Sequence, residues 1–289
     1  MKISIITWDA DFRDNLHLIE YFANQDFDEN EYEFIWVDYY HSNVRVKKEI
    51  DKFKNFKLIE LENPKTKNWH LGKCINKGCD SSNGDVLVLC DGDIAVEEDF
   101  LSHIWNEHKD NKNLSLYFQR FEELEKLHNE KSSKDIKILK KNCILKSVNN
   151  NGGCLSIRKE NFMYVGGYET HSVFEKQGMV NKELYIRLKN AGFDIRWEKD
   201  KYIYHPWHPN TLGSGRDSVE KKNINVFKWA RAIYPWINPA QTEQSWVIYK
   251  RDYDLIYKAD ESNCNKYLEN IPKINTDIFK KIHDLKLFE

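Results

Sequence analysis

The chain has 289 residues and a formal net charge of −2, and 40% of its residues are hydrophobic. A nearly neutral chain lacks the basic surface of a general nucleic-acid-binding protein, so we expect no nucleic-acid partner. No apolar run approaches the roughly 18 residues that a membrane-spanning helix needs, and the first residues show no signal-peptide pattern. The length suits one large α/β domain, or one domain with an appendage.

The six cysteines are scattered along the chain and form no C-x-x-C pair. Cys90 and Cys154 lie in apolar segments typical of strands, where a buried free thiol is the usual state. We therefore expect structural thiols rather than a zinc site. Several unpaired cysteines fit a reducing compartment, so we predict a cytoplasmic protein.

The first 96 residues alternate between apolar strands and amphipathic helices. Strands are predicted at 1–8, 32–37, 56–61 and 86–90, and helices at 13–24, 44–54 and 68–82. This alternation predicts the α/β class: a doubly wound, mostly parallel sheet with right-handed connections and helices on both faces.

The pattern continues less regularly beyond residue 96. The segment 121–142 is rich in lysine and glutamate, and it predicts either a solvated excursion or a mobile loop over the site. From residue 211 the alternation gives way to an aromatic, helical extension. The remaining predictions are helices at 97–112 and 179–191 and strands at 114–118, 154–157 and 194–204.

An acidic tripeptide, Asp91-Gly92-Asp93, follows the most apolar of these strands. Aspartate is a poor strand residue, so two of them at the end of a buried strand need another explanation. Open α/β sheets bind ligands at the carboxyl ends of their strands, and paired carboxylates suit Mg²⁺ or Mn²⁺ holding a diphosphate. The alternative is a solvated Asp-Gly turn between two strands.

Several other motifs follow one another in a defined order. They are the strand Ile3 to Thr7, Trp36-Val37-Asp38, the segment 69–78 with Lys73 and Asn76, Asp91-Gly92-Asp93, Asn151-Gly152-Gly153 with Gly166-Gly167-Tyr168, the segment 181–188, and Tyr204-His205. In this order they resemble the nucleotide-diphospho-sugar glycosyltransferases of the GT-A fold, especially the family 2 group and relatives with a galactosyltransferase-like C-terminal half. The resemblance covers residues 1–210 and implies a nucleotide-binding half (1–96), an acceptor half (97–210) and an extension (211–289).

The resemblance also implies roles for individual residues. The metal, Mn²⁺ or Mg²⁺, would be bound chiefly by Asp93 and His205, with Asp91 and His208 as further candidates. An imidazole ligand favours Mn²⁺. The nucleotide-sugar donor, expected to be a UDP-sugar, would be bound by Thr7, Asp9, Asp38, Lys73, Asn76, Asp91 and Gly92. The acceptor would meet Gly152, Gly153 and Trp207.

The catalytic base departs from the family pattern. Inverting members usually carry Glu-Asp where this chain has Val180-Asn181, and asparagine cannot act as a base. Glu183 keeps a carboxylate two residues further on, and Glu175 and Glu169 are other options. Asn-x-Glu also resembles the corresponding helix of retaining polypeptide N-acetylgalactosaminyltransferases, so the stereochemistry stays open at this point.

These observations predict a metal-dependent hexosyl- or N-acetylhexosaminyltransferase of polysaccharide biosynthesis, with a glycan or lipid-linked saccharide as acceptor. A non-catalytic glycan- or nucleotide-sugar-binding scaffold on the same fold is an alternative, suggested by Asn181. A sugar nucleotidyltransferase is a weaker one, because the loop after the first strand lacks the glycines of that class. The aromatic, basic segment 226–236 predicts either a helix closing the core or a peripheral contact with the inner face of the cell membrane.

Overall fold

The computed structural model describes residues 1–209, apart from residues 14, 42–43, 171–173, 177–178 and 191. The predicted extension 211–289, with its possible membrane contact, lies outside the described residues. Within the described part, no helix has the length and apolar character needed to cross a bilayer.

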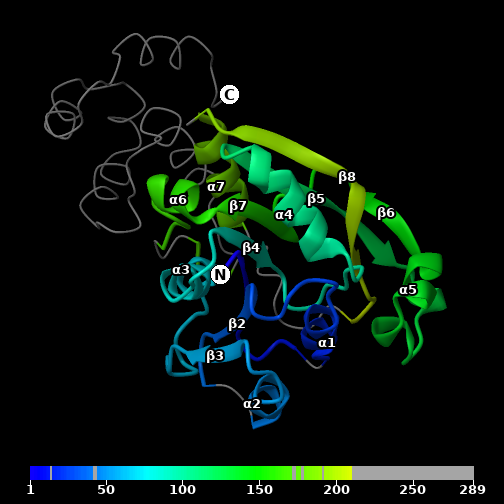
Figure 1. The fold of residues 1–289 in the computed structure, drawn as a ribbon. Helices are drawn as coiled ribbons and strands as arrows, with labels where there is room; N and C mark the ends of the chain where they lie inside the picture. The colour runs from blue at the N-terminus through cyan, green and yellow to red at the C-terminus, as the bar shows by residue number, and fades with distance from the viewer. Residues whose placement is uncertain (14, 42–43, 171–173, 177–178, 191, 210–289) are drawn as a thin grey trace, which may run out of the picture.

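The described chain forms one α/β unit (Figure 1). Its helices are α1 (His17–Ala23), α2 (Val44–Ile50), α3 (Leu71–Asp80), α4 (Phe100–Asp110), α5 (Ile136–Asn142), α6 (Lys159–Tyr164) and α7 (Met179–Asn190). Its strands are β1 (Ile3–Asp9), β2 (Tyr32–Asp38), β3 (Phe56–Glu60), β4 (Val86–Cys90), β5 (Leu114–Glu123), β6 (Cys143–Ser147), β7 (Cys154–Arg158) and β8 (Asp194–His205). Two short 3₁₀ turns, Glu125–Leu127 and Ser132–Lys134, lie between β5 and α5.

The sheet has the strand order β3-β2-β1-β4-β7-β5-β6, and β8 pairs with β5. The first four strands in this order are parallel, β7 is antiparallel to both of its neighbours, and β8 runs parallel to β5. The predicted doubly wound, mostly parallel sheet is therefore confirmed. β6 is antiparallel to β5 as well. Because β5 and β8 run in the same direction as β4, on the far side of β7, the carboxyl ends of β1, β2, β4 and β8 lie at one edge.

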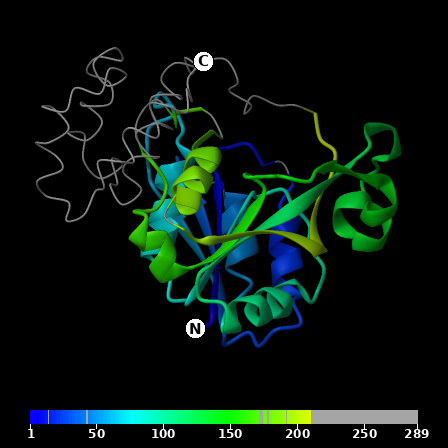
Figure 2. The same cartoon turned by 90° about the horizontal axis from the view of Figure 1, so that it is seen from above.

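Helices cover both faces of the sheet (Figures 1 and 2). One core joins the sheet to α1, α2 and α4 and includes Phe22, Val46 and Ile104. The other joins it to α3, α6 and α7 and includes Ile75 and Leu184. Because both faces are buried, β1, β2 and β4 are apolar almost throughout, which is why their positions could be read from the sequence.

The segment 121–142 contains regular secondary structure, and its residues His128 and Ser133 line the cavity at the site. β5 continues to Glu123, five residues beyond its predicted end, and α5 begins at Ile136 with Asp135 as its N-cap. The exposed strand β6 and the short helix α6 were not predicted, because β6 has little apolar patterning and α6 is only six residues long.

A short antiparallel bridge connects the chain after Asp93 to the end of β8. Ala95 and Tyr204 exchange two backbone hydrogen bonds, with N···O distances of 2.7 and 3.0 Å. Both residues are buried. The bridge therefore fixes His205 beside the acidic tripeptide, although more than a hundred residues separate them in sequence.

His108 on α4 predicts an acid-sensitive fold. Its Nε2 lies 2.9 Å from the Ser156 hydroxyl of β7, and burial, with Arg158 nearby, lowers the pKa of His108 to about 3. The unfolded chain takes up this proton near pH 6.5 and the folded chain does not, so stability falls as the pH drops from about 6.5 towards 3. Urea titrations across this range should show a smaller pH dependence for His108→Gln than for wild type. The exposed His41 gives the control: His41→Gln should keep the wild-type slope, and an unchanged slope in His108→Gln would contradict the assignment.

Candidate active site

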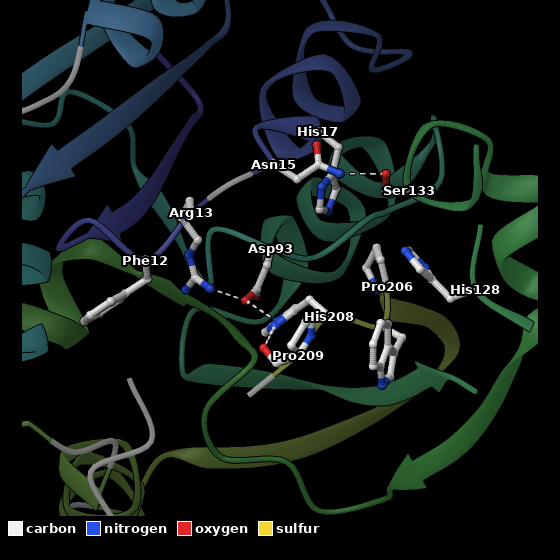
Figure 3. Close-up of a pocket in the computed structure, with 11 residues that line it drawn as sticks. Phe12, Arg13, Asn15, His17, Asp93, His128, Ser133, Pro206, His208 and Pro209 are labelled. Atoms are coloured by element: carbon white, nitrogen blue, oxygen red, sulfur yellow. Dashed lines mark hydrogen bonds and ion pairs between the residues drawn. The ribbon is translucent and has the colours of Figure 1, made fainter. Parts of the chain in front are cut away.

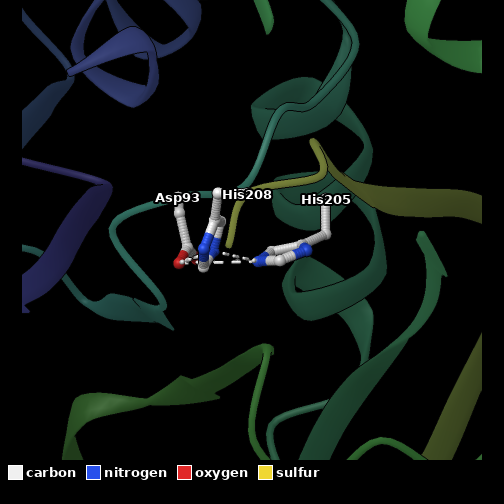
Figure 4. A group of neighbouring side chains, drawn as sticks. All are labelled: Asp93, His205 and His208. Atoms are coloured by element: carbon white, nitrogen blue, oxygen red, sulfur yellow. Dashed lines mark hydrogen bonds and ion pairs between the residues drawn. The ribbon is translucent and has the colours of Figure 1, made fainter. Parts of the chain in front are cut away.

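Asp93, His205 and His208 converge at the carboxyl edge of the sheet (Figure 4). The Oδ2 atom of Asp93 lies 3.5 Å from Nε2 of His205 and 3.4 Å from Nε2 of His208. The two imidazole Nε2 atoms are 3.3 Å apart. One ligand atom from each side chain thus faces a common point, and one carboxylate with two imidazoles is a donor set that suits a divalent transition metal. Asp91, predicted as a further ligand, lies outside this group of three.

Arg13, which the sequence did not mark as a site residue, also contacts Asp93. Its Nη1 is bonded to Asp93 Oδ2, the oxygen that faces both imidazoles. Burial raises the pKa of Asp93, but Arg13, His205 and His208 outweigh that effect and hold it well below its usual range. Arg13 lies in the loop after β1, where a lone arginine in a polar loop gives no signal in a single sequence.

Asp91 faces a different environment from Asp93. Burial and the neighbouring negative charge of Asp93 raise the pKa of Asp91. Asp91 lines a small cavity together with Gly152 and Asn181. The three predicted residues thus come together where the end of β4 meets α7. Gly153, next to Gly152, is instead packed tightly: a Cβ there would lie 2.5 Å from Ile203 Cδ1.

The predicted donor residues of β1 and β2 lie side by side, because Asp9 and Asp38 are direct neighbours in the parallel register. Asp9 accepts hydrogen bonds from the backbone N–H groups of Ala10 and Phe12, at 2.8 and 2.9 Å. Burial raises the pKa of Asp38 to about 6, with Asp9 adding repulsion. Two adjacent buried carboxylates at a sheet edge form a suitable acceptor pair for ribose hydroxyls or base N–H groups.

Thr7 and Gly92 lie beside this pair. The Thr7 hydroxyl is buried and has no hydrogen-bond partner among the described residues. A Cβ at Gly92 would lie 3.3 Å from that hydroxyl and 3.1 Å from Arg13 Nε. A side chain at position 92 would crowd both groups. Because Gly92 has none, a ligand can approach its backbone closely.

Two predicted donor residues on α3 have different surroundings. The Asn76 side-chain amide makes two hydrogen bonds with the backbone of Tyr168, each 2.8 Å long. Both ends of the amide are therefore engaged in holding α3 to the turn after α6, which disfavours a donor contact. Lys73 is half-buried on the same helix.

The three acidic groups considered as the catalytic base all accept hydrogen bonds from other groups of the chain. Glu183 is 3% exposed, and its two oxygens accept hydrogen bonds of 2.6 and 2.7 Å from Arg187, which is fully buried. This pairing disfavours Glu183 as a base. Glu169 accepts a hydrogen bond from the Thr170 N–H, and Glu175 accepts one from the Asn68 amide.

Asn181 occupies the first turn of α7, where inverting relatives would carry their base. Its Oδ1 accepts a 2.8 Å hydrogen bond from the Tyr168 hydroxyl, and its side chain is 8% exposed. Its amide nitrogen would be 3.1 Å from a Cβ at Gly152. The side chain is thus oriented with its N–H groups towards the small cavity, where it can donate but not accept.

A larger cavity of about 230 Å³ has Asp93 in its wall (Figure 3). The buried Glu123 holds two residues of the cavity wall in place. The Glu123 carboxylate accepts a 3.1 Å hydrogen bond from the Trp207 backbone N–H and pairs with His128 Nδ1 at 2.8 Å. It also accepts a 2.8 Å hydrogen bond from the Asn142 amide. The ring of Trp207, predicted on the acceptor side, lies 5.4 Å from that of His128. A tryptophan among polar groups suits a saccharide.

His17 lines the same cavity. It is 3% exposed, and neither ring nitrogen has a hydrogen-bond partner among the described residues. Burial lowers the pKa of His17 to about 4, so the ring is neutral at pH 7. Beside it, the Asn15 amide donates a 2.7 Å hydrogen bond to the Ser133 hydroxyl.

The family model "glycosyltransferase like family 2" matches residues 12–197, more than half of the chain. The chain belongs to the family 2-like glycosyltransferases. Comparison with curated proteins gives no significant match.

Solved structures share the fold at low sequence identity. The structure of S. aureus TarS 1–349 in complex with UDP is 13% identical, has a TM-score of 0.59, and aligns with 96% of this chain and 77% of its own. The complex of the same protein with UDP-GlcNAc is 14% identical, with a TM-score of 0.56 and coverage of 98% and 91%. GalNAc-T7 with UDP, GalNAc and Mn²⁺ is 11% identical, with a TM-score of 0.58 and coverage of 94% and 58%. These matches establish the GT-A fold of this glycosyltransferase.

The Glu183–Arg187 pair predicts a stability phenotype rather than a catalytic one. Glu183→Gln leaves the Arg187 guanidinium buried without a charged partner, which should lower the free energy of unfolding by about 3 kcal/mol or more in urea titrations. The double variant Glu183→Leu/Arg187→Met should recover much of this loss, and the exposed Lys182→Gln should have little effect. Wild-type stability together with lost turnover in Glu183→Gln would instead support the role of base.

Proposed function

We propose that this glycosyltransferase moves a sugar from a UDP-sugar to a glycan or lipid-linked saccharide acceptor, with Mn²⁺ or Mg²⁺ at Asp93, His205 and His208. The observation that carries the proposal is the position of this cluster. It lies at the same sheet edge as the carboxylate pair Asp9 and Asp38. A nucleoside at that pair would extend its diphosphate towards the cluster.

The neighbouring structures support the choice of donor. TarS is described in complexes with UDP and UDP-GlcNAc, and GalNAc-T7 with UDP, GalNAc and Mn²⁺. In this chain Asp9, Asp38 and Thr7 would bind the nucleoside, and Asp91 and Gly92 would lie along the ribose and diphosphate. The transferred group would be a hexose or an N-acetylhexosamine.

The divalent ion would neutralise the charge that builds on the leaving diphosphate. Asp93 would hold it through Oδ2, and the two imidazoles would complete the protein's share of the ligands through Nε2. Imidazole ligands and the donor set as a whole favour Mn²⁺ over Mg²⁺. Because burial lowers the pKa of His205, its ring is available as a neutral ligand at pH 7.

The acceptor would lie between the small cavity at Gly152 and Asn181 and the larger one at Trp207. Asn181 can donate a hydrogen bond to a donor or acceptor sugar, but it cannot take a proton. Since Glu183 is also engaged, we propose transfer without a base on α7, as in retaining members. Assigning the anomeric configuration of the product by NMR tests this point.

The presence of Asn181 on α7, together with the pairing of Glu183 with Arg187, also favours one other candidate. This candidate is a non-catalytic scaffold that binds a glycan or a nucleotide sugar. Incubation with a panel of sugar nucleotides and Mn²⁺ separates the two, because glycosyltransferases hydrolyse their donors slowly without an acceptor. Metal-dependent release of UDP supports the enzyme. Nucleotide binding without any turnover supports the scaffold, and the absence of nucleotide binding contradicts both. A role in polysaccharide biosynthesis, a cytoplasmic location and membrane contact through residues 211–289 remain predictions from the sequence.

Removing a ligand of the cluster should abolish the metal effect, which is measured as the shift in melting temperature that UDP and Mn²⁺ produce. Asp93→Ala loses the charged ligand, so UDP with Mn²⁺ should no longer raise its melting temperature, a shift that mass action produces in wild type. Asp93→Ala also leaves the buried Arg13 without its carboxylate partner, so its melting temperature without UDP and Mn²⁺ should be lower than that of wild type. His205→Ala should bind Mn²⁺ more weakly and recover partly at high Mn²⁺, and His208→Ala, which is more exposed, should be milder.

The control is His103→Ala, a partly buried histidine that pairs with Glu198 away from the cluster. It should keep the full melting-temperature shift. If Asp93→Ala keeps the shift, the metal site is assigned wrongly. If His208→Ala is affected more strongly than His205→Ala, the order of the two imidazoles must be reversed.

A further inference from the structure

A single oxygen atom of the candidate metal site faces two kinds of cation partner. Asp93 Oδ2 accepts the hydrogen bond from Arg13 Nη1, and it is also the atom that lies 3.5 and 3.4 Å from the two imidazole nitrogens. The side chains of Arg13 and Asp93 are only 12% and 13% exposed. A guanidinium and a divalent ion at this one oxygen would repel each other and compete for its lone pairs, so each weakens the binding of the other.

The surroundings hold the Arg13 guanidinium close to the site. Its charge interacts favourably with Asp93, Asp91 and Asp9. The Arg13 carbonyl accepts a 2.8 Å hydrogen bond from Arg45, which anchors the backbone behind the side chain.

The guanidinium also has an unused donor. The Arg13 Nε–H is buried and has no hydrogen-bond partner among the described residues. Leaving such a donor unpaired costs free energy, and an anionic oxygen would be the strongest partner for it. A diphosphate entering beside Gly92 would bring such oxygens, since a Cβ at that glycine would lie 3.1 Å from Arg13 Nε.

We propose that Arg13 competes with the divalent ion for Asp93 Oδ2, and that the diphosphate of the donor draws Arg13 away from it. This inference rests on the proposed metal- and nucleotide-dependent function. Without nucleotide, Arg13 weakens metal binding, because the ion must displace it. With nucleotide, Arg13 pairs with the diphosphate, the carboxylate is released to the metal, and the two ligands bind cooperatively. By linkage, each ligand strengthens the other by the same factor.

Arg120 provides a matched control. It is also close enough to act electrostatically on Asp91 and His205, but its Nη2 is bonded to Glu122 at 2.6 Å. Removing its charge changes the local field without freeing Asp93. A second control is Arg196, which is 44% exposed and paired with Glu107 on α4.

The test is a titration of the full-length protein with Mn²⁺, in which electron paramagnetic resonance reports the free ion, with and without UDP. Without UDP, Arg13→Gln should bind Mn²⁺ about tenfold more tightly than wild type, the factor expected for the loss of one charge-assisted hydrogen bond. UDP should increase Mn²⁺ affinity less in Arg13→Gln than in wild type. Arg120→Gln and Arg196→Gln should remain close to wild type in both respects.

The outcomes separate the inference from the proposed function. If Arg13→Gln and Arg120→Gln strengthen Mn²⁺ binding equally, only the field matters and the competition is wrong. Unchanged affinity in Arg13→Gln also overturns it. If wild type binds no Mn²⁺ even with UDP, the metal site itself is wrong. If Arg13→Gln does not fold, Arg13→Lys is the variant to test. Because the lysine side chain is shorter and carries a single-point charge, Arg13→Lys should bind Mn²⁺ more tightly than wild type. An unchanged Mn²⁺ affinity overturns the inference.

Discussion

The bridge between Ala95 and Tyr204 is the constraint on which the site depends. It connects the segment that leaves β4 to the end of β8, through two backbone hydrogen bonds of 2.7 and 3.0 Å in a buried position. Backbone pairing of this kind does not use the side chains at the site. The side chains on either side of the bridge can therefore serve as ligands without weakening the pairing. Asp93 and His205 are brought together by the fold and not by attraction to each other.

The edge of the sheet concentrates negative charge to an extent that the fold must compensate. Asp9, Asp38, Asp91 and Asp93 lie at the ends of three adjacent strands, and burial acts to raise the pKa of each carboxyl. Only at Asp93 do the neighbouring cationic groups outweigh burial and lower the pKa. Arg13 is the cation that the structure sets against Asp93. Buried carboxylates that repel one another reduce stability, which is the usual cost of a site prepared for a cation.

The sequence predicted the parts of this protein that depend on periodic patterning. Buried parallel strands are apolar throughout, so β1, β2 and β4 were identified, and the acids that follow them marked the ligand edge. Contacts between distant segments could not be read in this way. Nothing in the sequence links Arg13 to Asp93, Asn76 to the backbone of Tyr168, or Glu123 to the Trp207 loop, and the engagement of Glu183 depends on the burial of Arg187, one turn further along α7.

The central claim is that Asp93, His205 and His208 hold a divalent ion that also binds the diphosphate of a nucleotide. Pulsed electron paramagnetic resonance of the protein with Mn²⁺ and UDP tests it most directly, because couplings to ¹⁴N and ³¹P identify the ligands of the ion. The account predicts ³¹P couplings together with ¹⁴N couplings from two imidazoles, one set of which disappears in His205→Ala. A Mn²⁺–UDP spectrum without any ¹⁴N coupling would contradict it.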